Sequence, residues 1–196
     1  MGNRFAVFLD RDGTLNAEVE YLRTPDELQI IKGAAAAIRR LNESHIITCV
    51  ISNQSGIARG FLTEADLIPI HAKLREEFLR EGATLDRIYY CPHHPTEGVE
   101  PYNVECECRK PKPGMLRQGA KEFGLELHRC FVVGDSVVDI QAGNAVGTKT
   151  ILVQTGYGAK SLQTCREKNI PVDFVAASVV EAVEFIFDHG KRRYYS

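Results

Sequence analysis

Residues 5–16 read FAVFLDRDGTLN, and this stretch decides the fold. Its first five residues are all apolar, as is typical of a short strand buried on both faces of a parallel sheet. The carboxylates of Asp10 and Asp12 follow this strand directly, and Gly13 allows a sharp turn behind them. An Asp-Gly pair is also common in ordinary surface turns. Two acids about 4 Å apart repel by about 4 kcal/mol, so their place after a buried strand favours a site that holds a cation or a shared proton.

Beyond this strand, apolar runs alternate with helical patterns along the whole chain. We predict further strands over residues 46–52, 87–90, 130–135, 149–153 and 173–178. Helices are predicted between them, over 33–44, 63–82, 112–124, 137–147 and about 178–189. Thr63 and Asp66 form a capping-box pattern, and Pro69 predicts an irregular start or a kink in that helix. This alternation indicates an α/β fold with a central parallel sheet and helices on both faces, in a single domain over residues 1–196.

Composition and charge exclude several classes of function. A chain of 196 residues, 44% of them hydrophobic, can bury a sizeable core. Its net charge of −2 at pH 7 is no nucleic-acid signature, and its only basic run is Lys191–Arg193, expected to be a solvated tail. No apolar run approaches membrane-spanning length, and residues 1–13 do not resemble a signal peptide. We therefore expect a cytoplasmic monomer without nucleic-acid or membrane partners, whose six cysteines stay reduced.

Polar residues follow two other predicted strands. Ser52 ends the second strand, and the residues after it expose backbone N–H groups that suit a phosphate oxygen, although a plain loop would look the same. Asp135 and Asp139 follow the fourth strand, a pattern that is also typical of acids at a helix N-terminus. Ligands of parallel sheets bind beyond the carboxyl ends of the strands. We therefore expect these residues to share one site with Asp10 and Asp12.

Thiols and imidazoles gather between the third strand and the following helix. The candidate ligands in this loop, at about residues 91–108, are Cys91, His93, Cys106 and Cys108. Three thiolates and one imidazole are a ligand set for a closed, tetrahedral, structural Zn²⁺ site. His94 is a competing ligand, and ordinary free cysteines are the plain alternative; a nucleic-acid-binding zinc module would need basic surroundings that are absent here. Bound zinc would anchor Arg109 and Lys110, which follow the last thiol directly.

In their order along the chain, these motifs resemble the haloacid dehalogenase (HAD) superfamily of phosphatases. The residues that carry the resemblance are Asp10-x-Asp12-Gly13-Thr14, Ser52, Lys110 and Gly134-Asp135-x-x-x-Asp139. The resemblance implies a Rossmann-like HAD fold with no large cap domain and with the zinc-binding loop as an insertion. It also implies that Asp10 attacks phosphorus to form an aspartyl-phosphate, while Asp12 transfers protons as general acid and base.

The same resemblance implies further roles at this site. The groups implied to hold catalytic Mg²⁺ are the Asp10 carboxylate, the Asp12 backbone carbonyl and the Asp135 carboxylate. Ser52 and a lysine would hold the phosphoryl oxygens. Either Lys110 or Lys112 could be this lysine, and the resemblance selects Lys110. Asp139 would orient that lysine, or hold a metal ligand in place without binding the metal itself.

Three longer matches narrow the resemblance to one subfamily. The stretches YYCPHHP (89–95), CxCRKPxPGM (106–115) and NQSGIARG (53–60) look like those of the D-glycero-D-manno-heptose 1,7-bisphosphate 7-phosphatases. These enzymes remove the 7-phosphate of a small sugar bisphosphate on the route to nucleotide-activated heptose and the lipopolysaccharide core. The residues that this resemblance implies as substrate contacts are Glu18, Tyr21, Asn53, Gln54, Ser55 and Arg109.

Two alternatives stay open beside this subfamily. The histidinol-phosphate phosphatases of histidine biosynthesis share the zinc ligands and the Arg-Lys-Pro, but typically have a shorter spacer and lack the Pro-Gly-Met found here at 113–115. The second alternative is a non-catalytic HAD relative that only binds metal or ligand. The full set of carboxylates argues against it. Ser136 stands where the heptose enzymes often carry a lysine, so the sequence leaves open which anomer is preferred.

Overall fold

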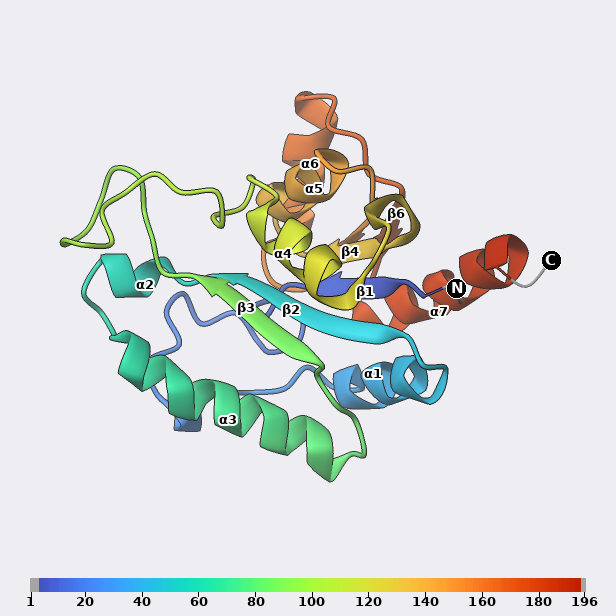
Figure 1. The fold of residues 1–196 in the computed structure, drawn as a ribbon, viewed down its shortest axis with the longest axis horizontal. Coiled ribbons are helices and arrows are strands. Elements are labelled where there is room, and N and C mark those ends of the chain that lie inside the picture. The colour runs from blue at the N-terminus through green and yellow to red at the C-terminus, as the bar shows by residue number, and fades with distance from the viewer. Residues whose placement is uncertain (1–3, 195–196) are drawn as a thin grey trace.

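Six parallel strands form one sheet in the order β3-β2-β1-β4-β5-β6. The computed structural model describes residues 4–194, and Figure 1 shows the sheet at its centre. The strands are β1 (Ala6–Leu9), β2 (Ile47–Asn53), β3 (Arg87–Cys91), β4 (Phe131–Gly134), β5 (Lys149–Val153) and β6 (Phe174–Ala176). Every neighbouring pair is parallel, so all six carboxyl ends lie along one edge. The predicted parallel α/β sheet is confirmed.

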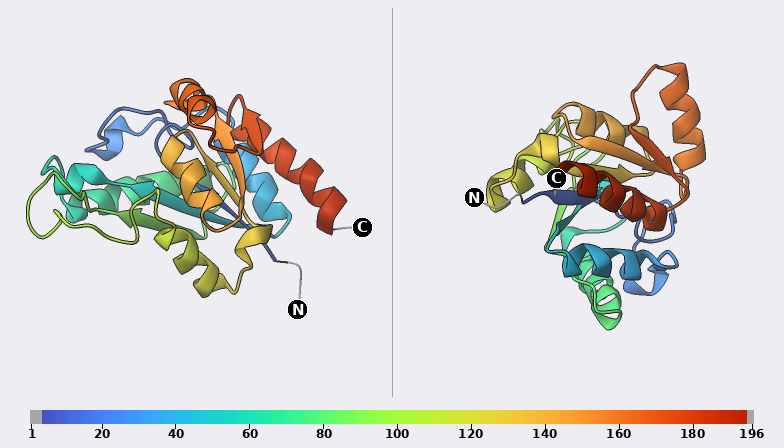
Figure 2. Two further views of the ribbon diagram at one scale, coloured as in Figure 1. Left: turned by 90° about the horizontal axis from the view of Figure 1, so that it is seen from above. Right: turned by 90° about the vertical axis from the view of Figure 1, so that its right-hand side faces the viewer.

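Helices cover both faces of this sheet (Figures 1 and 2). On one face lie α1 (Ala34–Glu43), α3 (Glu64–Arg80) and α7 (Val179–Tyr194). On the other lie α4 (Gly114–Phe123) and α5 (Val137–Asn144), with α6 (Gly158–Glu167) beside α5. The shorter elements are α2 (Ser55–Ala58) and the 3₁₀ turns η1 (Pro25–Glu27) and η2 (Leu127–Arg129). Within the described chain, the segments between strands hold these elements and loops, with no inserted cap domain.

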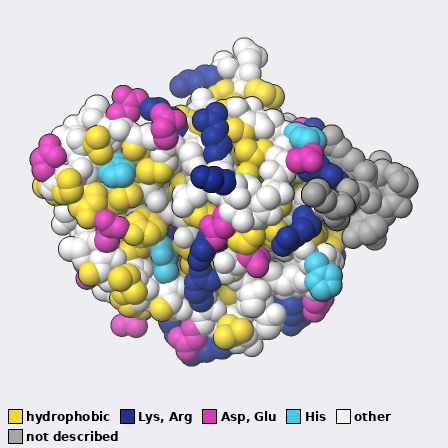
Figure 3. Space-filling view, in the orientation of Figure 1, with side chains coloured by type: hydrophobic (Ala, Val, Ile, Leu, Met, Phe, Trp, Pro, Cys, Tyr) yellow, Lys and Arg dark blue, Asp and Glu magenta, His cyan; other side chains and the backbone are white. Residues whose placement is uncertain are grey.

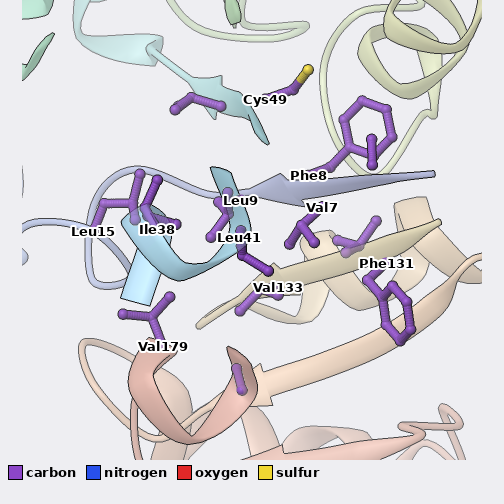
Figure 4. Packing of buried hydrophobic residues seen from close by; sticks show 14 of the residues in the cluster. Val7, Phe8, Leu9, Leu15, Ile38, Leu41, Cys49, Phe131, Val133 and Val179 are labelled. Atoms are coloured by element: carbon purple, nitrogen blue, oxygen red, sulfur yellow. The ribbon is translucent and has the colours of Figure 1, made fainter. Parts of the chain in front are cut away.

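The central strand β1 is buried along its whole length, as its apolar sequence predicts. Phe8 points toward α4, where a Cβ on Gly119 would lie only 2.6 Å from its ring. On the opposite side Leu9 lies beside Ile38 and Leu41 of α1 (Figure 4). Each such buried side chain contributes about 1.5–3 kcal/mol relative to exposure, so the packing fixes the end of β1, where Asp10 begins.

A second, smaller apolar cluster holds the loop that follows β1. Its buried members are Leu22, Ile57, Leu62, Leu67 and Ile70. They join the 16–33 loop to α2 and to the first half of α3. This cluster therefore presses the loop after Asp12 against the segment after β2.

Helix boundaries differ from the predictions in a few places. Thr63 caps α3, and its hydroxyl accepts from the Asp66 N–H at 3.2 Å, as the capping-box pattern predicts. The helix continues past Pro69, its sixth residue, so the proline does not end the helix although its missing N–H removes one backbone hydrogen bond. Helices α2 and α6 were not predicted. The basic run 191–193 falls within α7, and its side chains lie outside the described part of the chain. In residues 4–194 no helix combines the length and apolar character needed to cross a bilayer.

Candidate active site and metal cluster

A lysine lies between Asp10, at the carboxyl end of β1, and Asp139, in the first turn of α5. The Lys110 ammonium is 2.6 Å from Asp10 Oδ1 and 2.6 Å from Asp139 Oδ1, and it donates to the Ile51 carbonyl at 2.8 Å. All three charged side chains are buried. Burial lowers the pKa of Lys110, but the two carboxylates outweigh it and the pKa is raised. The site therefore has a fixed positive charge at its base.

The side chain of Asn53, at the end of β2, fixes the backbone of Lys110. Asn53 Nδ2 donates to the Lys110 carbonyl, and the Lys110 N–H donates to Asn53 Oδ1, both at 3.0 Å. These two bonds join segments that are 57 residues apart in the sequence. Both polar groups of Asn53 are thus used inside the protein, where they set the position from which the lysine side chain extends.

Three carboxylates face one another at this strand edge. Oxygens of Asp10, Asp135 and Asp139 all lie within 4.8 Å of one another. Burial raises the pKa of Asp135 to about 7, and neighbouring acids add to the effect. Burial also raises the pKa of Asp10 well above its ordinary value, although the Lys110 charge opposes this. Buried carboxylates that ionise with difficulty on their own are stabilised by a hard divalent cation, so these residues fit Mg²⁺.

Two glycines from distant segments enclose the carboxylate of Asp135. A Cβ on either Gly13 or Gly156 would lie 2.1 Å from Asp135 Oδ2, and both glycines have positive φ, at 76° and 54°. Thr155 Oγ1 donates to the Gly13 carbonyl at 2.5 Å, and the Tyr157 N–H donates to Asp135 Oδ2 at 2.7 Å. Residues 155–157 were not among the predicted site residues. Their position directly after β5, at the same edge of the sheet, was the available signal.

Asp12 lies beside these groups with its carboxylate surrounded by N–H donors. Arg11 Nε lies 3.1 Å from both carboxylate oxygens, and Arg11 Nη2 donates to Oδ2 at 2.8 Å. Asn16 Nδ2 donates to Oδ1 at 3.0 Å, and Gln54 Nε2 donates to Oδ2 at 3.1 Å. Burial raises the pKa of Asp12, but these partners outweigh it and leave the pKa below its ordinary value. Arg11 was missed in the sequence, where its place between two aspartates was the only signal.

The amide of Gln54 connects Asp12 with Ser52. Gln54 Nε2 also donates to Ser52 Oγ at 2.7 Å, and Gln54 Oε1 accepts from Arg11 Nη2 at 3.2 Å. Both Ser52 and Gln54 are buried. Both the amide nitrogen and the amide oxygen of Gln54 are therefore used to hold Arg11, Asp12 and Ser52 in place.

A cleft of about 170 Å³ lies over the buried charges. Its lining includes Asp10, Asp12, Glu18, Ser52, Asn53, Lys110, Ser136 and Tyr157. Tyr21 and Ser55 line a separate, adjoining cavity of about 40 Å³, which shares Asp12 and Asn53 with the cleft. Of the predicted substrate contacts outside the 52–55 segment, Glu18 is the one that faces the cleft directly.

The predicted zinc ligands converge at the end of β3. The cluster consists of Cys91, His93, Cys106 and Cys108. Its three sulfur atoms are 3.1–3.4 Å apart, and His93 Nδ1 lies 3.7 Å and 3.5 Å from two of them. His94 points away, and its Nδ1 accepts from the backbone N–H groups of Thr96 and Glu97 at 3.5 and 3.0 Å. The geometry therefore selects His93 over His94 as the fourth member.

The cluster fixes an irregular loop, seen at the left of Figure 1 between β3 and α4. Arg109 follows the last thiol, and its Nη1 donates to the His93 carbonyl at 3.0 Å. The loop is also joined to α3, because the Tyr102 hydroxyl donates to the Glu64 carboxylate at 2.8 Å. The hydroxyl of Tyr90, in β3, donates to the same carboxylate at 2.5 Å. These contacts hold the backbone that leads into Lys110.

On the face drawn in Figure 3, basic side chains are interspersed with acidic and apolar ones. This distribution agrees with the net charge of −2.

Comparisons with known proteins agree on one group of enzymes. A HAD-hydrolase-like family model matches residues 107–182. The D-glycero-beta-D-manno-heptose-1,7-bisphosphate 7-phosphatase of Pasteurella multocida (strain Pm70) is 44% identical over 152 residues, which is 77% of this chain and 82% of that protein. The phosphatase of the same name from Haemophilus ducreyi is 39% identical over 191 residues, which is 95% of this chain and 100% of that protein.

A solved structure extends the similarity to three dimensions. The D,D-heptose 1,7-bisphosphate phosphatase from B. bronchiseptica, complexed with magnesium and phosphate, superimposes with a TM-score of 0.84 at 34% identity. The match covers 94% of this chain and 99% of that one. This chain is therefore similar to that protein over nearly the whole fold.

Proposed function

Because this chain belongs to the heptose-1,7-bisphosphate 7-phosphatase family of HAD-like hydrolases, we propose that it removes the 7-phosphate of D-glycero-D-manno-heptose 1,7-bisphosphate. It is a phosphoric monoester hydrolase. The observation that carries the proposal is the buried Asp10–Lys110 pair at the base of a cleft, with Asp12 beside it. A carboxylate nucleophile and a fixed cation at one point are what phosphoryl transfer to a side chain requires.

The reaction has two half-reactions at Asp10. A carboxylate oxygen of Asp10 attacks phosphorus, the bond from phosphorus to the sugar oxygen breaks, and Asp12 gives that oxygen a proton. Water then attacks the aspartyl-phosphate, Asp12 takes up a proton from it, and the bond between phosphorus and Asp10 breaks to release phosphate. Lys110 and Ser52 hold the phosphoryl oxygens through both steps, where their donors stabilise the developing charge.

The carboxylate cluster fits a divalent cation. Asp10, the Asp12 backbone carbonyl and Asp135 would hold Mg²⁺, which when bound neutralises charge on the phosphoryl oxygens. Asp139 keeps Lys110 directed at Asp10 through its 2.6 Å contact. This assignment gives Asp139 a supporting role in which it does not touch the substrate.

The thiol and imidazole cluster fits structural zinc. Four ligands with no open position leave no place for substrate, so this metal would act by fixing the loop. Zinc ligation supplies an apparent ~10–16 kcal/mol in small peptides, which is enough to order a loop of this kind. Arg109, whose Nη1 is held by the His93 carbonyl, does not line the cleft and would meet only a part of the substrate that extends beyond it.

The remaining substrate contacts follow from the cleft. Glu18 can accept hydrogen bonds from sugar hydroxyls, and Tyr21 and Ser55 would meet any part of the sugar that enters the adjoining cavity. Asn53 and Gln54 are better placed to hold Lys110 and Asp12 than to touch the sugar. We also propose a cytoplasmic location, because thiolate ligands need a reducing compartment. The proposal further includes a monomer and a role in heptose activation for lipopolysaccharide.

The proposal is tested by phosphate release with Mg²⁺ from four substrates: the α and β heptose bisphosphates, histidinol phosphate and a simple sugar phosphate. A clear preference for a heptose bisphosphate, abolished in Asp10→Asn, is the expected result and identifies the anomer. Preference for histidinol phosphate would move the chain to histidine synthesis. No turnover of any substrate, with metal bound, would favour a binding role instead.

A further inference from the structure

Arg11 is the largest fully buried side chain in the described part of the molecule, at 1% exposure. Its guanidinium lies against the Asp12 carboxylate with one edge, so that Nε and Nη2 contact both oxygens at 2.8–3.1 Å. In residues 4–194, Asp12 is the one carboxylate that forms an ion pair with it. Removing a charge from water costs several kcal/mol, so a buried arginine needs such a partner.

We propose that Arg11 is a positioning residue for proton transfer, which aims the Asp12 carboxylate at the oxygen that leaves phosphorus. The inference rests on the proposed function, because it assumes that Asp12 is the general acid. A planar guanidinium makes two parallel contacts with a carboxylate and so fixes its plane, whereas a lysine ammonium makes one contact and leaves the carboxylate free to turn. The remaining Asp12 partners, Asn16 and Gln54, then bind at the outer positions.

The guanidinium is itself held from behind. His71 Nε2, on α3, lies 3.5 Å from Arg11 Nη1. Arginine can only donate, so this ring nitrogen must be the acceptor and the imidazole must be neutral. Burial and the Arg11 charge together lower the pKa of His71 to about 3, which agrees with a neutral ring. The ring of Tyr90 lies 5.7 Å from that of His71 and limits how far it can move.

If Arg11 positions Asp12, the loss of activity on replacing Arg11 depends on the leaving group of the substrate. If Arg11 is only structural, the loss is the same for every leaving group. A sugar alkoxide leaves slowly without a proton, whereas 4-nitrophenolate leaves readily as the anion. The ratio kcat/KM reports only steps up to departure of the leaving group, so it separates the acid step from later hydrolysis of the aspartyl-phosphate. Misaimed Asp12 must therefore reduce kcat/KM for the sugar phosphate more than for the aryl phosphate.

The experiment measures kcat/KM for heptose bisphosphate and for 4-nitrophenyl phosphate in wild type and Arg11→Lys. We expect a loss of about 10²-fold on the sugar phosphate and of less than about tenfold on the aryl phosphate. Arg75→Lys is the matched control, because Arg75 lies on the same helix as His71 and binds a backbone carbonyl. The control should keep the wild-type ratio between the two substrates.

A second variant guards against loss of folding in Arg11→Lys. His71→Leu removes the acceptor behind the guanidinium and should shift the substrate ratio in the same direction by a smaller factor. Equal losses on both substrates, or no loss, would overturn the inference and leave Arg11 as a structural residue. Wild-type enzyme that releases no phosphate from heptose bisphosphate would contradict the proposed function instead, so the two failures are distinguishable.

Discussion

Lys110 Nζ lies 2.6 Å from Asp10 Oδ1, although 100 residues separate the two in the sequence. The pair is buried, and Asn53 fixes the lysine backbone from the end of the neighbouring strand. The cation is therefore positioned before any substrate arrives. Such preorganisation is the main way in which a protein stabilises charge that develops during phosphoryl transfer.

Replacing Lys110 by glutamine should reduce kcat by about 10²–10³-fold, the usual effect of losing one oxyanion donor. Lys112→Gln is the matched control, since Lys112 pairs with Glu105 and Glu107 on the surface, at 2.8 and 3.2 Å. The measurement is steady-state phosphate release at saturating Mg²⁺. Equal activity in the two variants would show that the wrong lysine has been placed at the phosphate.

The glycines that enclose Asp135 give a second prediction. Gly156→Ala puts a methyl group 2.1 Å from the Asp135 carboxylate, so that the oxygen must move from its place in the cluster. The Mg²⁺ concentration for half-maximal activity should rise about 10–100-fold, as expected when support for a ligand is lost. Activity titrated against Mg²⁺ measures this directly.

Gly124→Ala is the control for backbone strain. Gly124 also has positive φ, at 65°, but its added Cβ would meet nothing within 4 Å. Both variants should lose about 1–2 kcal/mol of stability from the left-handed backbone. If Gly124→Ala raised the Mg²⁺ requirement as much as Gly156→Ala, general destabilisation and not the Asp135 contact would be the cause.

The sequence predicted the sheet well because its strands are short and mostly apolar, and helical patterns or loops separate them. Each of the six strands lies within about two residues of its predicted place, and the capping pattern at Thr63 located the start of α3. Helix α2 was missed because it is only four residues long, in a glycine-containing stretch typical of loops. In α6 only Gly158, Ser161 and Cys165 are buried, so its apolar stripe is too weak to recognise.

Part of the active site was predictable because strand ends determine it. Parallel strands bring their carboxyl ends to one edge, so the neighbourhood of Asp10, Ser52 and Asp135 follows from their positions after strands. The hydrogen bond from the Tyr157 N–H to Asp135 depends on β5 lying next to β4, which the sequence does not specify. The contact between Arg11 and Asp12 depends on side-chain direction, which no sequence pattern reports.

Loss of the zinc cluster should affect catalysis through the loop. Cys106→Ser removes one of the four ligands, and we expect lower zinc content, a lower melting temperature and a loss of activity of about 10–100-fold. The effect follows because Lys110 comes two residues after the last thiol. Cys165→Ala is the control, since this buried cysteine lies in α6 outside the cluster. Full activity in Cys106→Ser with no zinc bound would argue that hydrogen bonds alone order the loop.

His71 should make stability depend on pH. Its pKa falls to about 3 in the folded chain, chiefly through burial, with the Arg11 and Arg75 charges lowering it further and Asp12 opposing them. Below about pH 6.5 the unfolded chain takes up a proton that the folded chain does not, so folding weakens as pH falls from about 6.5 toward 3. One such proton contributes a slope of at most about 1.4 kcal/mol per pH unit.

Denaturant unfolding at a series of pH values between about 6.5 and 4.5 measures this slope. Glutamine cannot take up the proton in either state, so His71→Gln should unfold with a flatter dependence on pH than wild type. His128→Gln is the control, because it removes one histidine from the surface, near Glu126. An identical slope in wild type and His71→Gln would mean that His71 accepts a proton in the folded chain. That result would also contradict its role as acceptor for Arg11 Nη1.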